Sequence, residues 1–287
     1  MNIIELKSLT KTYDNFILGP INLTVPSGNI IGLIGENGAG KTTLIKSILG
    51  IIGYDKGEVL LWKEPISKNL ARNEKIGVVL DNMFFPELLK PTDINLIMKQ
   101  AYQNWDEPLF YSYLEQFQIP KNSPLKSCSK GMRKKIEIAT ALSHHPELLI
   151  LDEPTSGLDP VVRAEILDIF LNFIQDENHT ILLSTHITSD LEHIADYIVF
   201  LDKGKIIVQE DKDTLQEEYA ILKCDETVFQ TISNSDMIRF RKNKYSYDIL
   251  IKNKQAIQKK YPSAVIDKIT LEDLMVLYIK GLKGETR

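Results

Sequence analysis

The sequence of 287 residues predicts an α/β fold with a buried parallel sheet, followed by a small α+β domain. Short apolar runs alternate with helical stretches through most of the chain, a pattern typical of parallel strands that helices cover on both faces. Hydrophobic residues make up 43% and charged residues 25% of the composition, as in globular proteins in general. Because this pattern changes near residue 212, we expect one domain over residues 1–212 and a second over residues 213–287.

Turn residues and apolar periodicity place the elements of the first domain in order. We expect strands over residues 3–9, 16–25, 29–35, 76–80, 148–151 and 181–185. We expect helices over residues 41–50, 133–142, 160–175 and 188–195, and a helix-rich stretch over 92–118. Residues 197–208 are expected to form a hairpin, because Asp202-Lys203-Gly204 is a turn signal between two apolar runs.

The charge balance and the absence of long apolar runs exclude several classes of protein. Lys and Arg number 34 against 39 Asp and Glu, so no basic surface for a nucleic-acid partner is expected. No apolar run reaches the roughly 18–20 residues of a membrane-spanning helix, and the N-terminus does not resemble a signal peptide. Two cysteines, Cys128 and Cys224, form no disulfide framework, which favours a cytoplasmic protein with reduced thiols.

A glycine-rich loop of the pattern G-x-x-x-x-G-K-[ST] covers residues 35–42, between a predicted strand and a predicted helix. Glycine lets the backbone turn its N–H groups toward phosphate oxygens, and the following helix directs its positive end at the same anion. Lys41 would neutralise the β- and γ-phosphates of ATP, and the Thr42 hydroxyl would ligate Mg²⁺. The residues expected to bind the nucleotide here are Asn37, Gly38, Ala39, Gly40, Lys41, Thr42 and Thr43.

Two adjacent carboxylates, Asp152 and Glu153, end the apolar run over residues 148–151. Charges at the end of a strand are often merely solvated, but here Thr42 already implies a Mg²⁺ ion nearby. Asp152 would hold this ion through water, and Glu153 would polarise the attacking water as a general base. The pair therefore indicates hydrolysis of the bound nucleotide.

Four further segments narrow the family. They are Tyr13, which lies 22 residues before the loop, Cys128-Ser129-Lys130-Gly131-Met132, Ser156-Gly157-Leu158-Asp159, and Ser184-Thr185-His186, which ends 33 residues after Glu153. In this order the set resembles the nucleotide-binding subunit of an ABC transporter, over about residues 1–212. The resemblance implies a P-loop NTPase of the ABC type, with a RecA-like parallel sheet core, an antiparallel β subdomain and an α-helical subdomain.

The resemblance also implies roles for the matching residues. Tyr13 would stack on the adenine, although an aromatic residue near a strand is more often part of a core. His186 would sense the γ-phosphate and steady the attacking water. Ser129 and the Gly131 backbone would contact the γ-phosphate that the opposite subunit binds, and Asp159 would cross the interface. Each active site would then be divided between two ATPase subunits, in a homodimer or a heterodimer that ATP holds together.

Two positions depart from the family's pattern. The signature before the Asp152 strand normally begins with Leu and ends with Gln, where this chain has Cys128 and Met132. A small buried thiol is the expected role of Cys128. Where the family has a Gln after a strand, this chain has Asp81. We expect Asp81 to replace that Gln as a contact to Mg²⁺ and the attacking water, and as a link to the membrane partner. The alternative is a plain turn residue.

The next residues, Met83, Phe84, Phe85 and Pro86, match a stretch that in the family lines a groove for a helix of the membrane subunit. Adjacent phenylalanines beside a methionine suit an adaptable apolar socket. The same residues could equally belong to the core.

Residues 213–287 carry no motif that indicates chemistry. They hold 13 basic and 11 acidic residues, which leaves 21 and 28 in residues 1–212, so the acidity lies in the first domain. We expect strands over residues 219–224 and 237–251, and helices over residues 253–260 and 271–280, the last with Thr270 as its N-cap. This last helix resembles the C-terminal helix of drug- and peptide-exporting ABC subunits. Packing or dimerisation is its expected role, and a regulatory ligand site is the alternative.

The residues and the resemblance together imply the ATPase subunit of a membrane exporter. It would lie on the inner face of the cell membrane, against a polytopic membrane subunit on a separate chain. Bacterial exporters of drugs and antimicrobial peptides, such as those of phenol-soluble modulins, are the most similar subgroup. A soluble ABC ATPase in translation or DNA repair is the alternative, but such proteins usually carry two cassettes or a long coiled coil. Glu153 and His186 disfavour a module that binds ATP without hydrolysis.

Overall fold

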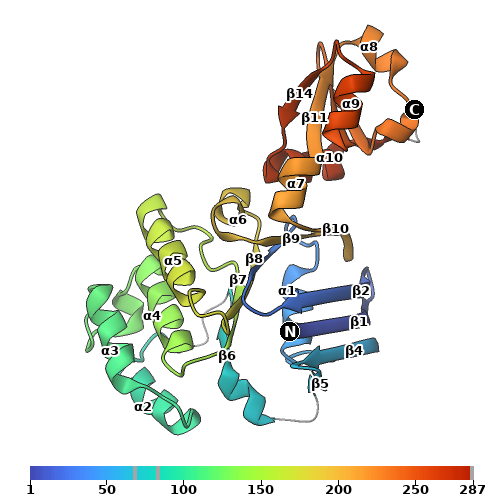
Figure 1. Ribbon diagram of the computed structural model, residues 1–287. Coiled ribbons are helices and arrows are strands. Elements are labelled where there is room, and N and C mark those ends of the chain that lie inside the picture. Colours follow the sequence, from blue (N-terminus) through green and yellow to red (C-terminus); the bar gives the residue numbers. More distant parts are fainter. Residues whose placement is uncertain (67–69, 82–84, 285–287) are drawn as a thin grey trace.

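The computed structural model describes residues 1–66, 70–81 and 85–284, and these residues form three sheets (Figure 1). The first sheet is antiparallel, in the order β2-β1-β4-β5, with β1 Asn2–Tyr13, β2 Phe16–Pro26, β4 Lys56–Leu61 and β5 Glu64–Pro65. The second has the order β10-β9-β3-β8-β7-β6, with β3 Ile30–Ile34, β6 Ile76–Val79, β7 Leu148–Asp152, β8 Thr180–Thr185, β9 Tyr197–Asp202 and β10 Lys205–Asp211. All of its pairs are parallel except β9 with β10.

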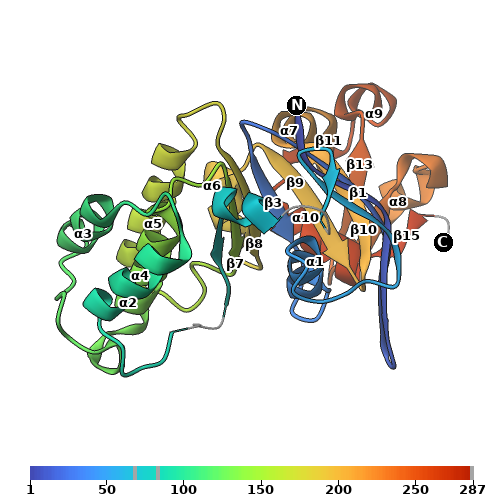
Figure 2. The same ribbon diagram turned by 90° about the horizontal axis from the view of Figure 1, so that it is seen from below.

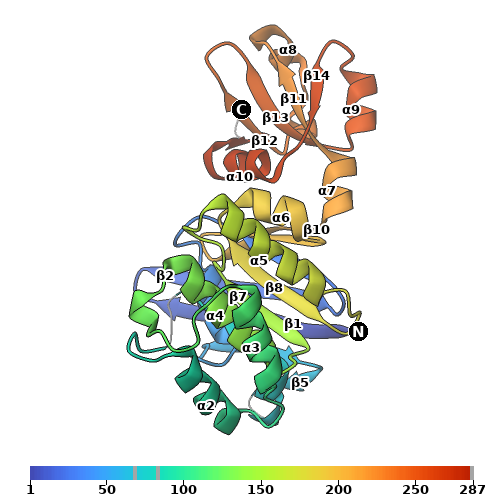
Figure 3. The ribbon, with the colours of Figure 1, turned by 90° about the vertical axis from the view of Figure 1, so that its left-hand side faces the viewer.

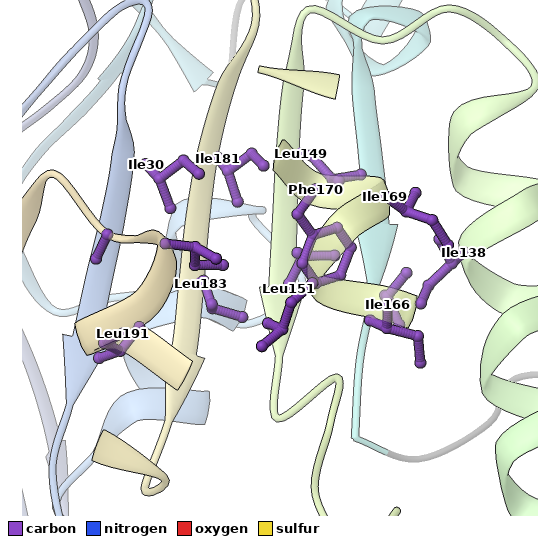
Figure 4. Close-up of a cluster of buried hydrophobic side chains, with 14 of the residues drawn as sticks. Ile30, Ile138, Leu149, Leu151, Ile166, Ile169, Phe170, Ile181, Leu183 and Leu191 are labelled. Carbon is purple, nitrogen blue, oxygen red and sulfur yellow. The ribbon is translucent and has the colours of Figure 1, made fainter. Parts of the chain in front are cut away.

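The parallel sheet is buried on both faces, as its near-continuous apolar strands predict. Successive side chains of a strand point to opposite faces, and β7 illustrates the result. Leu149 and Leu151 belong to the cluster that packs against helix α5 (Pro160–Phe173), together with Phe170 of that helix (Figure 4). Leu148 and Ile150 belong to the cluster formed with the antiparallel sheet and helix α1 (Lys41–Ile48). The predicted parallel core and antiparallel subdomain are therefore confirmed.

A helical subdomain lies on the side of the parallel sheet away from β1, β2 and β4 (Figures 1 and 2). It contains α2 Pro91–Ala101, α3 Glu107–Gln116 and α4 Lys130–Leu142, with the 3₁₀ turn η3 Leu125–Ser127. The 3₁₀ helix η2 Leu70–Lys75 instead leads into β6 at the edge of the sheet. The helix-rich stretch predicted over residues 92–118 is thus two helices. Asp106 separates them, because its side chain accepts the Leu109 N–H and caps α3. Among the described residues, no helix has the length and apolarity needed to cross a membrane.

The third sheet belongs to the C-terminal segment, by which we mean residues 213–287. Its order is β14-β11-β13-β12-β15, with β11 Tyr219–Cys224, β12 Arg239–Lys242, β13 Tyr247–Lys252, β14 Val265–Lys268 and β15 Leu282–Lys283. Around it lie α7 Lys212–Glu218, α8 Glu226–Thr231, η4 Asn234–Asp236, α9 Lys254–Lys260 and α10 Leu271–Lys280. The N-cap predicted at Thr270 is confirmed, since its hydroxyl accepts the Asp273 N–H at 3.0 Å. Helix α10 lies between this sheet and helix α6 (Thr188–Ile194), as Figures 1 and 3 show.

Phe170 connects α5 to the parallel sheet, and its side chain is fully buried. We expect Phe170→Ala to lower the free energy of unfolding by about 3–5 kcal/mol, because the substitution removes buried area and leaves a cavity. Urea unfolding followed by circular dichroism measures the change. Asp168→Ala, at an exposed position of the same helix, should change it by less than about 0.5 kcal/mol. Equal effects of the two substitutions would contradict this role of Phe170.

Glu226, at the start of α8, carries a pH-dependent share of the stability of the C-terminal segment. Hydrogen bonds from Tyr247, Lys242 and Gln230 lower the pKa of Glu226 from 4.5 to about 2. A lowered pKa stabilises the fold above the unfolded value and this stabilisation is lost as pH falls through the folded value. Glu226→Gln should therefore lower the Tm at pH 7, and the difference from the parent protein should shrink between about pH 4.5 and 2. Glu272→Gln, at an exposed carboxylate of α10, is the control, and a Tm difference for Glu226→Gln that does not depend on pH would refute the assignment.

Candidate active site

The glycine-rich loop connects the end of β3 to the start of α1, and its conformation depends on glycine. Gly38 and Gly40 have φ values of 86° and 109°, in the left-handed region that glycine favours. A Cβ atom on Gly40 would lie 2.8 Å from the ring of Phe16. Helix α1 has neither a side-chain cap nor an acidic residue in its first turn. Its positive end therefore lies open to an anion.

A cavity of about 340 Å³ lies over this loop. Its lining residues are Phe16, Glu36, Asn37, Gly38, Gly40, Lys41, Thr42, Thr43, Asp81 and Glu153. The loop, the predicted base Glu153 and Asp81, the predicted replacement of the family's Gln, therefore share one space. Ala39 is buried below it, where its carbonyl accepts the Gly204 N–H at 2.9 Å.

Asp152 is fully buried at the end of β7 and joins two other elements. Its carboxylate accepts hydrogen bonds from the Thr42 hydroxyl at 2.8 Å and from the Ser184 hydroxyl on β8. A hydroxyl and a carboxylate side by side are oxygen ligands of the type that Mg²⁺ prefers, with phosphate and water oxygens for the rest. The described residues hold no group of three His, Cys, Asp or Glu that could bind a metal without such outside ligands.

Glu153 has a backbone φ of 51°, a left-handed conformation that costs a residue with a side chain about 1–3 kcal/mol and that concentrates at functional sites. Its Oε2 atom accepts a hydrogen bond from His186 Nδ1 at 2.8 Å, so this ring nitrogen carries the proton. Its Oε1 atom lies 3.2 Å from Lys41 Nζ and makes no hydrogen bond with the described residues. One oxygen is thus fixed while the other can accept a proton.

Lys41 folds back across the loop, where its ammonium group donates to the Gly35 carbonyl at 2.7 Å. Its side chain is buried and lies between the loop backbone and Glu153. Lys41, Thr42 and Glu153 thus line the cavity, and His186 contacts it only through its hydrogen bond to Glu153. The Lys41 ammonium supplies a positive charge suited to a phosphate chain.

Three predicted site residues lie apart from the cavity. Tyr13, 43% exposed, ends β1 beside Lys11, whose ammonium is 5.5 Å from the ring centroid. Ser129 is exposed and caps α4 by accepting the Met132 N–H at 3.1 Å, and Gly131 lies against Val162. According to the resemblance, Ser129 and Gly131 contact ATP bound to a second subunit. A single chain does not contain that contact, so their roles stay predictions. The stacking of Tyr13 on adenine likewise stays a prediction.

Sequence reasoning missed Phe16, the first residue of β2, whose ring lines the cavity. The sequence did contain a signal for it, because Phe16 is a second aromatic residue only three positions after Tyr13. It also missed the bond from Ser184 to Asp152, which no spacing along the chain indicates. Cys128 is buried, and burial raises the pKa of its thiol, in accord with the expected packing role. Met83 and Phe84 lie outside the described residues.

Comparisons with known proteins agree with this geometry. The model of the protein family described as ABC transporter matches residues 18–156. The lantibiotic transport ATP-binding protein SrtF of Streptococcus pyogenes is 33% identical over 229 residues, which cover 74% of this chain and 92% of that protein. The bacitracin transport ATP-binding protein BcrA of Enterococcus faecalis is 34% identical over 209 residues, which cover 71% of this chain and 68% of that protein.

A solved structure described as an ATP binding subunit of an ABC transporter has the same fold. It matches with a TM-score of 0.67 at 27% identity, over 75% of this chain and 92% of that chain. The chain therefore belongs to the ABC transporter family, as an ATP-binding subunit in which ATP hydrolysis is coupled to transport.

Proposed function

We propose that this chain is the motor subunit of an exporter of antimicrobial peptides or related drugs. The observation that carries the proposal is the Glu153 carboxylate, which His186 fixes at one oxygen while the other faces Lys41 at the edge of the cavity. Two relatives, SrtF and BcrA, are named for transport of a lantibiotic and of bacitracin, which supports this class of substrate. Because both are transport proteins, the soluble alternative in translation or DNA repair gains no support.

The residues of the cavity would divide the work of hydrolysis. The backbone of residues 37–43 and the Lys41 ammonium would bind the ATP phosphates, and Thr42 with Asp152 would hold Mg²⁺. When bound, Mg²⁺ neutralises charge on the β- and γ-phosphate oxygens. Glu153 would take a proton from the attacking water, and His186 would keep the Glu153 carboxylate oriented. Asp81, on the cavity wall, would contact the ion and the water.

A second ATPase subunit would complete each site, as a homodimer or a heterodimer. Ser129 and Gly131 begin α4 on the surface, so a phosphate bound to another subunit could meet the positive end of this helix. Asp159 caps α5 by accepting the Val161 and Val162 N–H groups, in the segment that would cross the interface. Bound ATP would favour the closed dimer, and hydrolysis would shift the population to the open one. We assign this motor to residues 1–212 and an accessory domain to residues 213–287.

A polytopic membrane subunit on another chain would dock beside Asp81, on the cytoplasmic side of the membrane. Phe85 lines an apolar cavity of about 230 Å³ with Met98 and Tyr102, close to the strand that leads to Asp81. Leu88 and Leu96, nearby on the helical subdomain, are large apolar side chains with more than half of their surface exposed. Exposed apolar side chains around a cavity are typical of an interaction surface.

Glu153→Gln tests the assignment of the general base. The amide cannot accept a proton, so we expect the rate of phosphate release to fall by about 100-fold or more while ATP still binds. Gel filtration with ATP and Mg²⁺ should then show an accumulated dimer. Glu177→Gln, at an exposed carboxylate outside the cavity, should keep the parent rate. Unchanged turnover in Glu153→Gln would reject the assignment.

Asp81→Ala tests the replacement of the family's Gln. We expect the ATPase rate of the assembled transporter to fall by about tenfold, because the link between the site and the membrane subunit is lost. Asp81→Gln, which restores the residue usual in the family, should retain most of the activity. Full activity of Asp81→Ala in the assembled transporter would refute the replacement of the family's Gln by Asp81, and Asp81 would then be a turn residue.

A further inference from the structure

Helix α6 connects the site to the C-terminal segment. It begins at Thr188, two residues after His186, whose ring holds the Glu153 carboxylate. Between them, the Ile187 N–H donates to the Thr185 hydroxyl at 3.0 Å, which ties the start of the helix to the end of β8. A shift of α6 would therefore move the backbone that carries His186.

The inner side of α6 is fixed by Asp190, which is 1% exposed. Its carboxylate accepts a hydrogen bond from the Thr155 hydroxyl at 2.6 Å and forms an ion pair with Arg163 of α5. Thr155 lies only two residues after Glu153. Helix α6 thus contacts the chain on both sides of the hydrogen bond between Glu153 and His186.

The outer side of α6 is fixed by Glu192, which binds the first residue of α10 and the first residue of α7. Its carboxylate accepts the N–H of Leu271, the first residue of α10, at 2.8 Å. Its backbone carbonyl accepts a hydrogen bond from the ammonium group of Lys212, the first residue of α7, at 3.0 Å. A carboxylate at the N-terminus of a helix is favourable, since it meets the positive end of the helix dipole. Figure 3 shows α6 directly against α10.

Apolar side chains also pack across this contact. Leu191 and Ile194 of α6 belong to the same buried cluster as Leu271, Leu274 and Leu277 of α10. A cavity of about 560 Å³ borders the contact and is lined by Glu192 and Leu271 among others, so the apolar cluster and the hydrogen bonds of Glu192 together hold the two helices in place. The cavity over the glycine-rich loop, in contrast, includes no residue of α6 or of the C-terminal segment.

We propose that Glu192 is a positioning residue, through which the C-terminal segment holds α6 and sets the rate of ATP hydrolysis. The proposal rests on the roles of Glu153 and His186 given above. With the segment seated on α6, His186 orients the Glu153 carboxylate. A displacement of α10 from α6 slows hydrolysis and leaves ATP binding unchanged, because the phosphate-binding loop lies on other elements.

Steady-state ATPase kinetics of the full-length chain test this proposal. Glu192→Ala should lower kcat by about five- to tenfold, with the KM for ATP within about twofold of the parent value. Glu192→Gln keeps an oxygen that accepts the Leu271 N–H, so its kcat should stay close to that of the parent. Glu217→Ala, at an exposed carboxylate of α7 that forms no hydrogen bond or ion pair with the described residues, is the matched control and should leave both constants unchanged. A purely structural role would not produce this split between kcat and KM with rescue by glutamine.

Lys212→Met provides a second variant, in case Glu192→Ala does not fold. It removes the hydrogen bond that the first residue of α7 donates to the Glu192 carbonyl, and kcat should again fall while the KM for ATP is kept. Parent-like kcat in both variants, or an equal loss in Glu217→Ala, would overturn the proposal. A wrong assignment of Glu153 as the base can be told apart from a wrong role for Glu192. The first would show as normal turnover in Glu153→Gln, and the second as normal turnover in the variants at Glu192 and Lys212.

Discussion

The site depends on the burial of one carboxylate, that of Asp152. An ionised carboxylate without contact to water is stable only when hydrogen bonds or opposite charges surround it. Here the hydroxyls of Thr42 and Ser184 supply those hydrogen bonds, from the first turn of α1 and from the end of β8. Helix α1 and strands β7 and β8 are thereby joined at one point. Glu153 is the residue directly after β7, and His186 is the residue directly after β8. The Mg²⁺ ion that the site would hold adds the positive charge that this arrangement lacks.

The parallel sheet makes this convergence possible. Strands β7, β8 and β3 are neighbours, and Asp152 pairs with Ser184 while Ile34 pairs with Thr185. Parallel strands end at a common edge, so the loops that follow them meet there although the sequence separates them widely. The strained conformation of Glu153 persists because the Glu153 N–H donates to the Ser184 carbonyl and its carboxylate binds His186.

Binding and hydrolysis are assigned to different sides of this edge. The loop before α1 would bind the phosphates, whereas α6 and the segment after Glu153 would orient the groups that act on water. The C-terminal segment contacts α6 through Glu192 and the apolar face of α10, and it contacts β10 through Lys252 and Glu210. Under the proposal above, the contact to α6 would affect the rate of hydrolysis rather than the affinity for ATP.

Local patterns in the sequence determined the fold class, the glycine-rich loop, the carboxylate pair and the cap of α10, because each depends on residues close together in the chain. Short elements such as β4 and β5 escaped prediction, since their few residues have no clear periodicity and their pairing with β1 is non-local. Only the tertiary structure decided that Phe16 lines the cavity, that Ser184 binds Asp152, and that Glu192 caps a helix 79 residues later in the chain. The physical reason is that such contacts follow from the order and register of strands and from helix packing, which hydrogen bonds and apolar burial across the whole chain set together.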